Sequence, residues 1–413
     1  MLNLRLLKHT DWILWFAAFS LLLIGCLSIF SATSSIENRL AAESFLFLKK
    51  HLMSLLLAVF SMLILLYFDY GHLKKIAIPL YFIMAGILLI VLFMGYTTLG
   101  AQRWISFGPF SFQPSEISKI LMIIFLANYL KDKKGKIQHL FDIVPLFLMI
   151  TIPFLLIFKQ PDLGTGLVFI FIFLAMLIWA QASPTLLILF ISPFFSVLFR
   201  PIFILWIIYI VCLVLALYLA RIDPIEFWLI VAINIGVGLA FPYIWHMLKP
   251  YQKQRIITFL NPAADPLGAG YHSLQSMIAI GGGGFLGKGF LQGSQTQMQF
   301  IPIQQSDFIF SVIGEEFGLW GAAIVLALFS IIILRAFRIA QEAKDFFGSL
   351  IAAGIASFFL FHFFVNIGMT LGILPIVGIP LPFVSYGGTS LLTSFICLAL
   401  LQNICMRRDK LFF

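Results

Sequence analysis

Three carboxylates stand at the start of a long apolar stretch of the chain. The segment QQSDFIFSVIGEEFG holds Asp307, Glu315 and Glu316, and the residues after it are mostly apolar as far as Leu334. A carboxylate can take a proton from an attacking hydroxyl or meet a cation. At a helical rise of about 1.5 Å per residue, Glu315 lies roughly 12 Å deeper than Asp307 and needs a partner within the protein. We therefore expect a site with acid or base chemistry at the beginning of this stretch.

Asp307 also has a simpler interpretation, because an acid just before a helix commonly caps its first turn. The two glutamates have no such interpretation, since they fall inside the helix. We expect their basic partners among three residues elsewhere in the chain: Arg103, Lys119 and Lys159.

A second polar segment, LGAQRWISFGPFSFQPSEISK, leads into a predicted helix at Pro114. Proline in the first turn, with an acid soon after it, is typical of a helix start. Glu116 and Lys119 are three residues apart and share one helix face. They either form an ion pair that fixes this helix or line a polar cavity. In the second case, the residues before them complete the cavity: Arg103, Trp104 and Gln113.

A third segment, FHFFVNIGMTLGILPIVGIPLPFVSYGGTS, places polar residues on an otherwise apolar helix. His362 and Asn366 are four residues apart, and such a face is either a hydrogen-bond site between helices or a ligand site. The prolines and glycines after residue 371 predict an ordered turn. The SYGGTS sequence then begins the last helix with backbone that neighbours can approach closely.

The composition is that of a membrane protein. Of the 413 residues, 62% are hydrophobic and 10% are charged, with a mean hydropathy of +1.06, which excludes a water-soluble globular chain. The net charge of +9 comes mainly from basic loops, which suit anionic membrane lipids and give no reason to expect nucleic acid. The four cysteines all fall in apolar segments, which predicts neither a disulfide framework nor a metal cluster.

Apolar runs long enough to cross about 30 Å of hydrocarbon recur along the chain. They cover residues 12–32, 51–68, 76–95, 113–130, 142–158, 164–181, 184–199, 201–219, 225–247, 308–333, 348–372 and 386–405. Prolines interrupt residues 184–222, which could instead form a re-entrant hairpin. Lys and Arg concentrate in alternate loops, so both termini are predicted to be cytoplasmic. We expect one transmembrane domain over residues 1–413, with the loop 249–306 on the outside.

That outer loop is rich in Gly, Gln, Asn and Pro, and long ordered loops usually carry function. Its run GGGFLGKG resembles part of a nucleotide phosphate-binding loop, but Gly289 stands where Ser or Thr is required and no strand precedes the run. The glycines instead indicate close backbone packing or a surface for pyrophosphate, with Lys288 beside it. Asp265 in DPLGAGYH is expected to form a turn or to contact a metal or substrate.

These segments gather acids, cations, amides and aromatic residues around one outward-opening cavity. Two classes of protein fit: a transporter with intramembrane ionisable residues, or an enzyme acting on a lipid-linked substrate. A transporter needs access from both sides of the membrane. Because the polar loops lie on one side only, the pattern favours the enzyme.

The motifs GAQRWI, QPSE..K, KQPDLGT, NP..DPLGAGYH, DFIF..IGEE.G and N.GM..GILP..G.PLP..SYGG together resemble those of the SEDS family (shape, elongation, division and sporulation). The resemblance covers most of the chain. It implies an all-α polytopic membrane protein, a bundle of ten core transmembrane helices, to which 184–222 adds a hairpin for a total of twelve. Division-type members commonly carry Lys where this chain has Val377, so the chain is more similar to the elongation type.

The resemblance implies a peptidoglycan glycosyltransferase that polymerises lipid II at the outer face of the bacterial cytoplasmic membrane. It also implies a class B penicillin-binding protein as transpeptidase partner and suggests a divalent cation, Mg²⁺ or Mn²⁺, for which the sequence has no ligand cluster. The proposed catalytic acid of the family falls on Asp307. Other family motifs fall on Arg103, Trp104, Glu116 and Lys119.

In the mechanism that this resemblance implies, the C4 hydroxyl of the acceptor sugar attacks C1 of the donor while Asp307 takes its proton. Basic residues meet the pyrophosphate leaving group, and the candidates are Arg103, Lys119 and Lys288. The predicted cavity residues also include Gln113, Asp265 and Glu315. The alternatives are a flippase for the lipid-linked precursor, a division-type polymerase, or a scaffold for wall enzymes.

Overall fold

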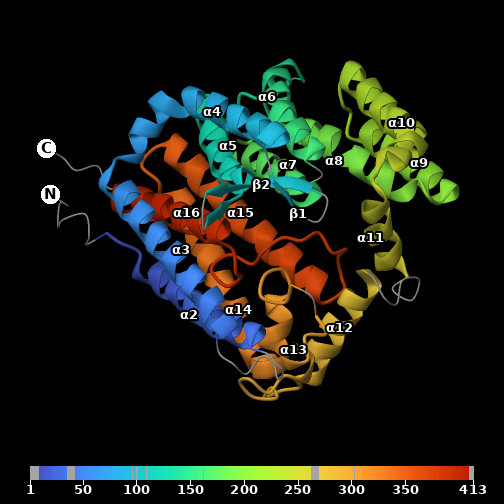
Figure 1. Ribbon diagram of the computed structural model, residues 1–413. Helices are drawn as coiled ribbons and strands as arrows, with labels where there is room; N and C mark the ends of the chain where they lie inside the picture. Colours follow the sequence, from blue (N-terminus) through green and yellow to red (C-terminus); the bar gives the residue numbers. More distant parts are fainter. Residues whose placement is uncertain are drawn as a thin grey trace, which may run out of the picture.

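The protein is a bundle of membrane helices (Figure 1). The computed structural model describes residues 9–34, 42–94, 96–98, 101–107, 110–138, 140–160, 162–261, 269–301 and 303–408. The long helices are α2 (Trp12–Thr33), α3 (Ala42–Tyr67), α4 (Leu73–Met94), α5 (Pro114–Leu130), α6 (Leu140–Lys159), α7 (Leu163–Trp179), α8 (Pro184–Phe199), α9 (Phe203–Leu219), α10 (Pro224–Met247), α14 (Ile309–Glu342), α15 (Phe346–Thr370) and α16 (Gly388–Met406). A 3₁₀ turn, η1 (Tyr70–His72), joins α3 to α4.

Each of the twelve predicted apolar segments coincides with one of these helices. Seven of the described helices are long and apolar enough to cross a membrane by length and hydropathy, and α6 to α9 are apolar but shorter. The chain is therefore a multi-pass helical membrane protein. The number of twelve crossings stays a prediction.

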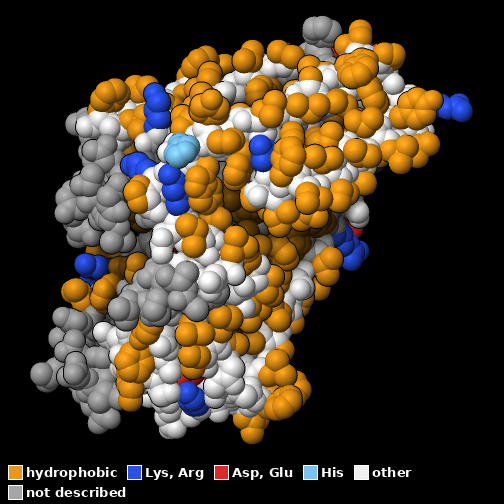
Figure 2. All heavy atoms as spheres, turned by 90° about the vertical axis from the view of Figure 1, so that its right-hand side faces the viewer, with side chains coloured by type: hydrophobic (Ala, Val, Ile, Leu, Met, Phe, Trp, Pro, Cys, Tyr) orange, Lys and Arg blue, Asp and Glu red, His pale blue; other side chains and the backbone are white. Residues whose placement is uncertain are grey.

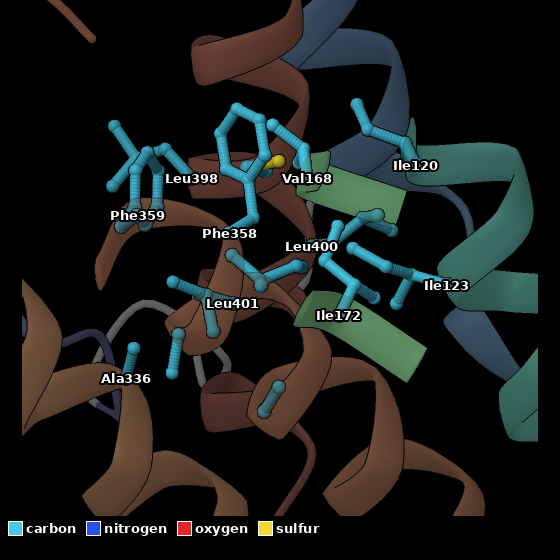
Figure 3. Packing of buried hydrophobic residues seen from close by; sticks show 14 of the residues in the cluster. Ile120, Ile123, Val168, Ile172, Ala336, Phe358, Phe359, Leu398, Leu400 and Leu401 are labelled. Carbon is cyan, nitrogen blue, oxygen red and sulfur yellow. The ribbon is translucent and has the colours of Figure 1, made fainter. Parts of the chain in front are cut away.

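The core of the bundle surrounds α15, which packs against α5, α7, α14 and α16. Figure 3 shows side chains of these helices directed at one another, including Ile123, Ile172, Phe358 and Leu401. Gly354 allows this approach, since a side-chain carbon there would lie 2.7 Å from Ile123 and 3.1 Å from the sulfur of Met176. The outer surfaces carry the opposite pattern, with exposed apolar side chains that suit lipid (Figure 2).

The glycine-rich run of the loop 249–306 packs backbone to backbone against a break in α14. The break lies at Gly318, whose φ of 63° and ψ of −157° are not helical. Lys288 N and Leu319 N donate across the break, to Glu315 O at 3.0 Å and Gly284 O at 2.9 Å. A side-chain carbon at Gly283 would lie 2.0 Å from the carbonyl oxygen of α14 residue 314. The prediction of close backbone packing is confirmed.

Two loops contain more structure than the sequence predicted. Residues 249–306 include the helices α11 (Pro250–Leu260), α12 (Ala269–Gly282) and α13 (Ser294–Gln297). The loop between α4 and α5 forms an antiparallel sheet of β1 (Tyr96–Thr98), β2 (Ala101–Phe107) and β3 (Phe110–Phe112). In this sheet Trp104 pairs with Tyr96, and Ile105 pairs with Phe112. The strands are too short for their alternation to be distinguished from a loop in the sequence.

Residues 184–222 form two helices, α8 and α9, which pack with α10 at one side of the bundle (Figure 1). Buried hydrogen bonds join the three. Asn234 Nδ2 donates to Ser192 Oγ at 2.8 Å, Tyr209 OH donates to Asn234 Oδ1 at 3.1 Å, and Trp206 Nε1 donates to Ser196 Oγ at 2.8 Å. Since hydrocarbon offers no partner for these groups, the contacts fix how the helices pack.

The same unit supplies a packing test at Gly238, where a side-chain carbon would lie 2.4 Å from the Trp206 ring. Gly238→Ala should lower the free energy of unfolding by about 1–3 kcal/mol, the usual cost of overpacking. Thermal unfolding in detergent measures this effect. Gly236→Ala is the control, because no neighbouring atom lies within 4 Å of a side-chain carbon at that position. Equal midpoints for the two variants would contradict the packing described here.

Candidate active site

One cavity of about 610 Å³ brings together segments that are far apart in the sequence. Its wall comes from β2, the beginnings of α5 and α7, the helices α11 and α12, and the segment before α14. Residues 376–380, after α15, and residues 386–390, at the start of α16, complete it. The lining residues are Arg103, Trp104, Gln113, Glu116, Lys119, Asp162, Thr165, Gln254, Arg255, His272, Ile303, Ser306, Asp307, Ile376, Val377, Gly378, Ile379, Pro380, Tyr386, Gly387 and Ser390.

Most predicted site residues meet at this cavity. Those that line it are Asp307, Arg103, Trp104, Gln113, Glu116 and Lys119. Asp265 lies outside the described residues. Lys288 and Glu315 do not line the cavity, and the expectation that they share it with Asp307 is not met.

Glu315 and Glu316 have partners other than the predicted ones. Lys288 Nζ lies 2.8 Å from Glu315 Oε1, and the backbone and hydroxyl of Thr296 also donate to this carboxylate, at 2.9 and 2.7 Å. Glu316 accepts a hydrogen bond from the hydroxyl of Ser31 on α2. The prediction that the two glutamates pair with Arg103, Lys119 or Lys159 is therefore wrong. The loop 249–306 folds back over α14 and brings Lys288 to Glu315, which the linear sequence does not reveal.

Asp307 lies partly exposed in the cavity, just before α14. The interpretation as a helix cap is wrong, because Phe308 holds the capping position and its side chain makes no capping bond. Asp307 Oδ1 instead accepts from Ser306 Oγ at 2.9 Å. Burial raises the pKa of the Asp307 carboxyl, an effect that the Ser306 hydroxyl and the positive charge of Arg255 partly oppose. A carboxylate with a raised pKa is a stronger base than an ordinary aspartate.

Glu116 and Lys119 form an ion pair and line the cavity, so both interpretations of the pair hold. Lys119 Nζ lies 2.6 Å from Glu116 Oε1 and 3.3 Å from His362 Nε2, with both side chains of the pair nearly inaccessible. The Phe358 ring covers the ammonium at 5.7 Å from its centroid. With its charge matched in this way, Lys119 supports the wall of the cavity.

Asp162 is a cavity residue that the sequence analysis missed. It caps α7 by accepting from Thr165 N at 3.2 Å, it accepts from Gln113 Nε2 at 3.3 Å, and it lies 3.8 Å from Arg103 Nη1. The signal was present in the KQPDLGT motif, where an acid precedes a predicted helix. Arg255 and His272 were also missed, since they lie on helices within what looked like a loop.

Comparison with known proteins agrees with this architecture. The family profile of the FtsW, RodA and SpoVE cell cycle proteins matches residues 11–222 and 206–410. The chain belongs to this family. This chain is 35% identical to "Peptidoglycan glycosyltransferase RodA" of Treponema pallidum, over 98% of this chain and 100% of that protein. It is 32% identical to "Probable peptidoglycan glycosyltransferase FtsW" of Geobacter metallireducens, over 98% and 97% of the two chains.

A solved structure is similar over nearly the whole chain. It is described as "Structural coordination of polymerization and crosslinking by a peptidoglycan synthase complex". The match has a TM-score of 0.71 and 26% sequence identity, and it covers 97% of this family member and 99% of that chain. The fold of the family member is thus the one that this structure has.

The buried pair gives a stability prediction. Lys119→Met should lower the free energy of unfolding by about 3–5 kcal/mol, because it leaves the Glu116 carboxylate buried without its cation. The double variant Glu116→Gln with Lys119→Met should recover part of this loss, since no unpaired charge remains. Thermal unfolding of the wild type, Lys119→Met, Glu116→Gln and the double variant measures the coupling. A double variant that is destabilised by the sum of the two single effects would contradict the pairing.

Proposed function

We propose that this chain polymerises glycan strands from lipid II at the outer face of the cytoplasmic membrane, with Asp307 as its general base. The activity class is that of its relatives, which are named as peptidoglycan glycosyltransferases over nearly their full lengths. The observation that carries the proposal is the Asp307 carboxyl, which bonds to the Ser306 hydroxyl in a cavity that Arg103 and Arg255 also line. A base and cationic groups are what glycosyl transfer from a pyrophosphate donor requires.

In the proposed step, the C4 hydroxyl of the acceptor sugar attacks C1 of the muramyl sugar of the donor. The oxygen of the pyrophosphate leaves C1 with the bonding electron pair, and the anomeric centre inverts. Asp307 takes the hydroxyl proton through Oδ2, since Oδ1 already accepts from Ser306. Arg103 and Arg255 are the cavity cations that face the growing negative charge of the leaving group. Lys119 supports the cavity instead, because Glu116 already matches its charge.

A divalent cation is a further part of the proposal. Among the described residues no group of three His, Cys, Asp or Glu side chains forms a metal site. A Mg²⁺ ion that binds together with substrate phosphates needs only one or two carboxylates. Asp307 and Asp162 are carboxylates at the cavity, but Thr165 and Gln113 already donate to Asp162. This fit is partial, so the reaction step above uses no metal.

We further propose that the two chain ends are cytoplasmic and that the chain works in elongation with a class B penicillin-binding protein. Basic loops on the side of the termini support the orientation. Val377, which lines the cavity where division-type members commonly carry Lys, supports the elongation role. The similar solved structure is described as a complex for polymerisation and crosslinking, and this supports a transpeptidase partner.

Asp307→Asn should lower the rate of glycan-strand formation from purified lipid II by at least about 10²-fold, because the amide cannot accept the hydroxyl proton. The assay uses the chain in liposomes, with its partner present, and includes an arm with EDTA followed by Mg²⁺ or Mn²⁺. Asp69→Asn, at the end of α3, is the control for an aspartate outside the cavity. Full activity of Asp307→Asn would disprove the general base. Lipid II crossing the bilayer without any polymer would favour the flippase.

The pKa of Asp307 gives a prediction for pH dependence. A base works only when deprotonated, so kcat/KM should fall as pH falls through the Asp307 pKa, and this acid limb should lie above the ordinary aspartate value of about 4. Arg255→Ala should move the limb to higher pH, because the cation that lowers this pKa is lost. Arg255→Lys, which keeps the charge, is the control. An acid limb at the same pH in Arg255→Ala and the wild type would contradict the assignment.

A further inference from the structure

The backbone around Asp307 is held by segments other than its own helix. The carbonyls of residues 305, 306 and 307 each accept a hydrogen bond from a different donor. Tyr386 N donates to the first at 2.8 Å and Ser385 Oγ to the second at 2.7 Å. Asn366 Nδ2 donates to the carbonyl of Asp307 itself at 2.9 Å. The position of the proposed base therefore depends on α15 and on the turn before α16.

Asn366 also bonds to a second part of the cavity wall. Its amide nitrogen donates to the Ile379 carbonyl at 2.7 Å, so both amide hydrogens are used, and the side chain is fully buried. One side chain thus connects residues 305–307, the segment that carries the proposed base, to the loop 378–380. Asn366 does not itself line the cavity, and it has no role in the reaction step given above.

His362, on the same helix, bonds to the loop 378–380 as well. His362 Nδ1 lies 3.0 Å from the Pro380 carbonyl, which can only accept, so Nδ1 carries the proton. The lone pair of Nε2 then faces Lys119 Nζ at 3.3 Å, and the lysine donates to it. Successive carbonyls of the loop, at residues 379 and 380, are therefore bonded to successive turns of α15.

The loop that α15 holds lies against the Asp307 carboxylate. Gly378 has φ of 77°, and a side-chain carbon there would lie 3.2 Å from Asp307 Oδ2. The oxygen that is proposed to take the proton therefore lies beside the loop, with little more than the space of one side-chain carbon between them. A shift of the loop or of the catalytic backbone changes the place of this oxygen in the cavity.

We propose that Asn366 is a positioning residue for glycosyl transfer. It fixes the position of the Asp307 carboxylate through its hydrogen bonds to the Asp307 carbonyl and to the loop 378–380, and His362 bonds to the same loop. This inference rests on the proposed function. A displacement of about 1 Å at a reacting group can lower a rate by about 10²-fold, whereas binding of substrate by distant contacts is unaffected. Asn366 therefore acts on kcat and not on KM.

The test compares Asn366→Leu and Asn366→Asp with Thr370→Val in the lipid II polymerisation assay. Leu keeps the size and removes both donors, and Asp keeps the shape with at most one donor. Thr370 is a matched control, since it is fully buried on the same helix and its hydroxyl bonds only within that helix, to the Ile367 carbonyl at 2.9 Å. Folded protein is quantified by size-exclusion chromatography, and rates are given per folded molecule.

Both Asn366 variants should lose kcat by about 10²-fold while KM stays within about twofold, and Thr370→Val should match the wild type. Asn366→Asp is the variant that decides if Asn366→Leu does not fold. A kcat for Asn366→Asp equal to that of Thr370→Val, or a change in KM alone, overturns the inference. Asp307→Asn is assayed alongside, because full activity there would mean that the proposed function has failed and not only the positioning role.

Discussion

Water is absent from the interior of a bilayer, and every polar group that this chain places there needs a partner from the protein. Lys119 is the strictest case, with an exposure of 1%. Its charge is met by Glu116, by the lone pair of His362 and by the face of the Phe358 ring. These contacts join α5 to α15. Because α15 also packs against α7, α14 and α16, this cluster connects α5 to the core of the bundle.

The cavity lies where helices end, which follows from the same constraint. A continuous helix uses its backbone groups internally, whereas a helix end leaves donors and acceptors unpaired. Here the free groups meet one another across segments. The glycine-rich run pairs with the break at Gly318, and the carbonyls before α14 accept from α15 and from the turn before α16. Hydrogen bonds to the backbone of residues 305–307 thus hold the proposed base in place, although it belongs to no helix.

The charges of the cavity divide into two kinds. Glu116 and Lys119 neutralise each other and are buried, so they stabilise its shape. Within the described part of the chain, the Asp307 carboxyl accepts from one neutral group, the Ser306 hydroxyl, and burial raises its pKa. The arginines face the same space from other elements, Arg103 from β2 and Arg255 from α11. A carboxylate that is not held in an ion pair can accept a proton from a substrate. This distinguishes a reactive carboxylate from a structural one.

The sequence by itself determined the helices, since hydropathy over about 20 residues reports directly on passage through hydrocarbon. It also identified the residue types at the cavity, because polar side chains are rare in such segments and stand out. Apart from the pair of Glu116 and Lys119, which are three residues apart on one helix, it did not determine the partners of the acids. Glu315 finds Lys288, and Glu316 finds Ser31 from the other end of the chain. Asp162 joins the cavity from the start of α7 and Arg255 from the middle of α11, which lie far apart in the sequence. Only the tertiary structure decided these pairs, because side-chain partners depend on how helices and loops pack in three dimensions, and no local pattern encodes that distance.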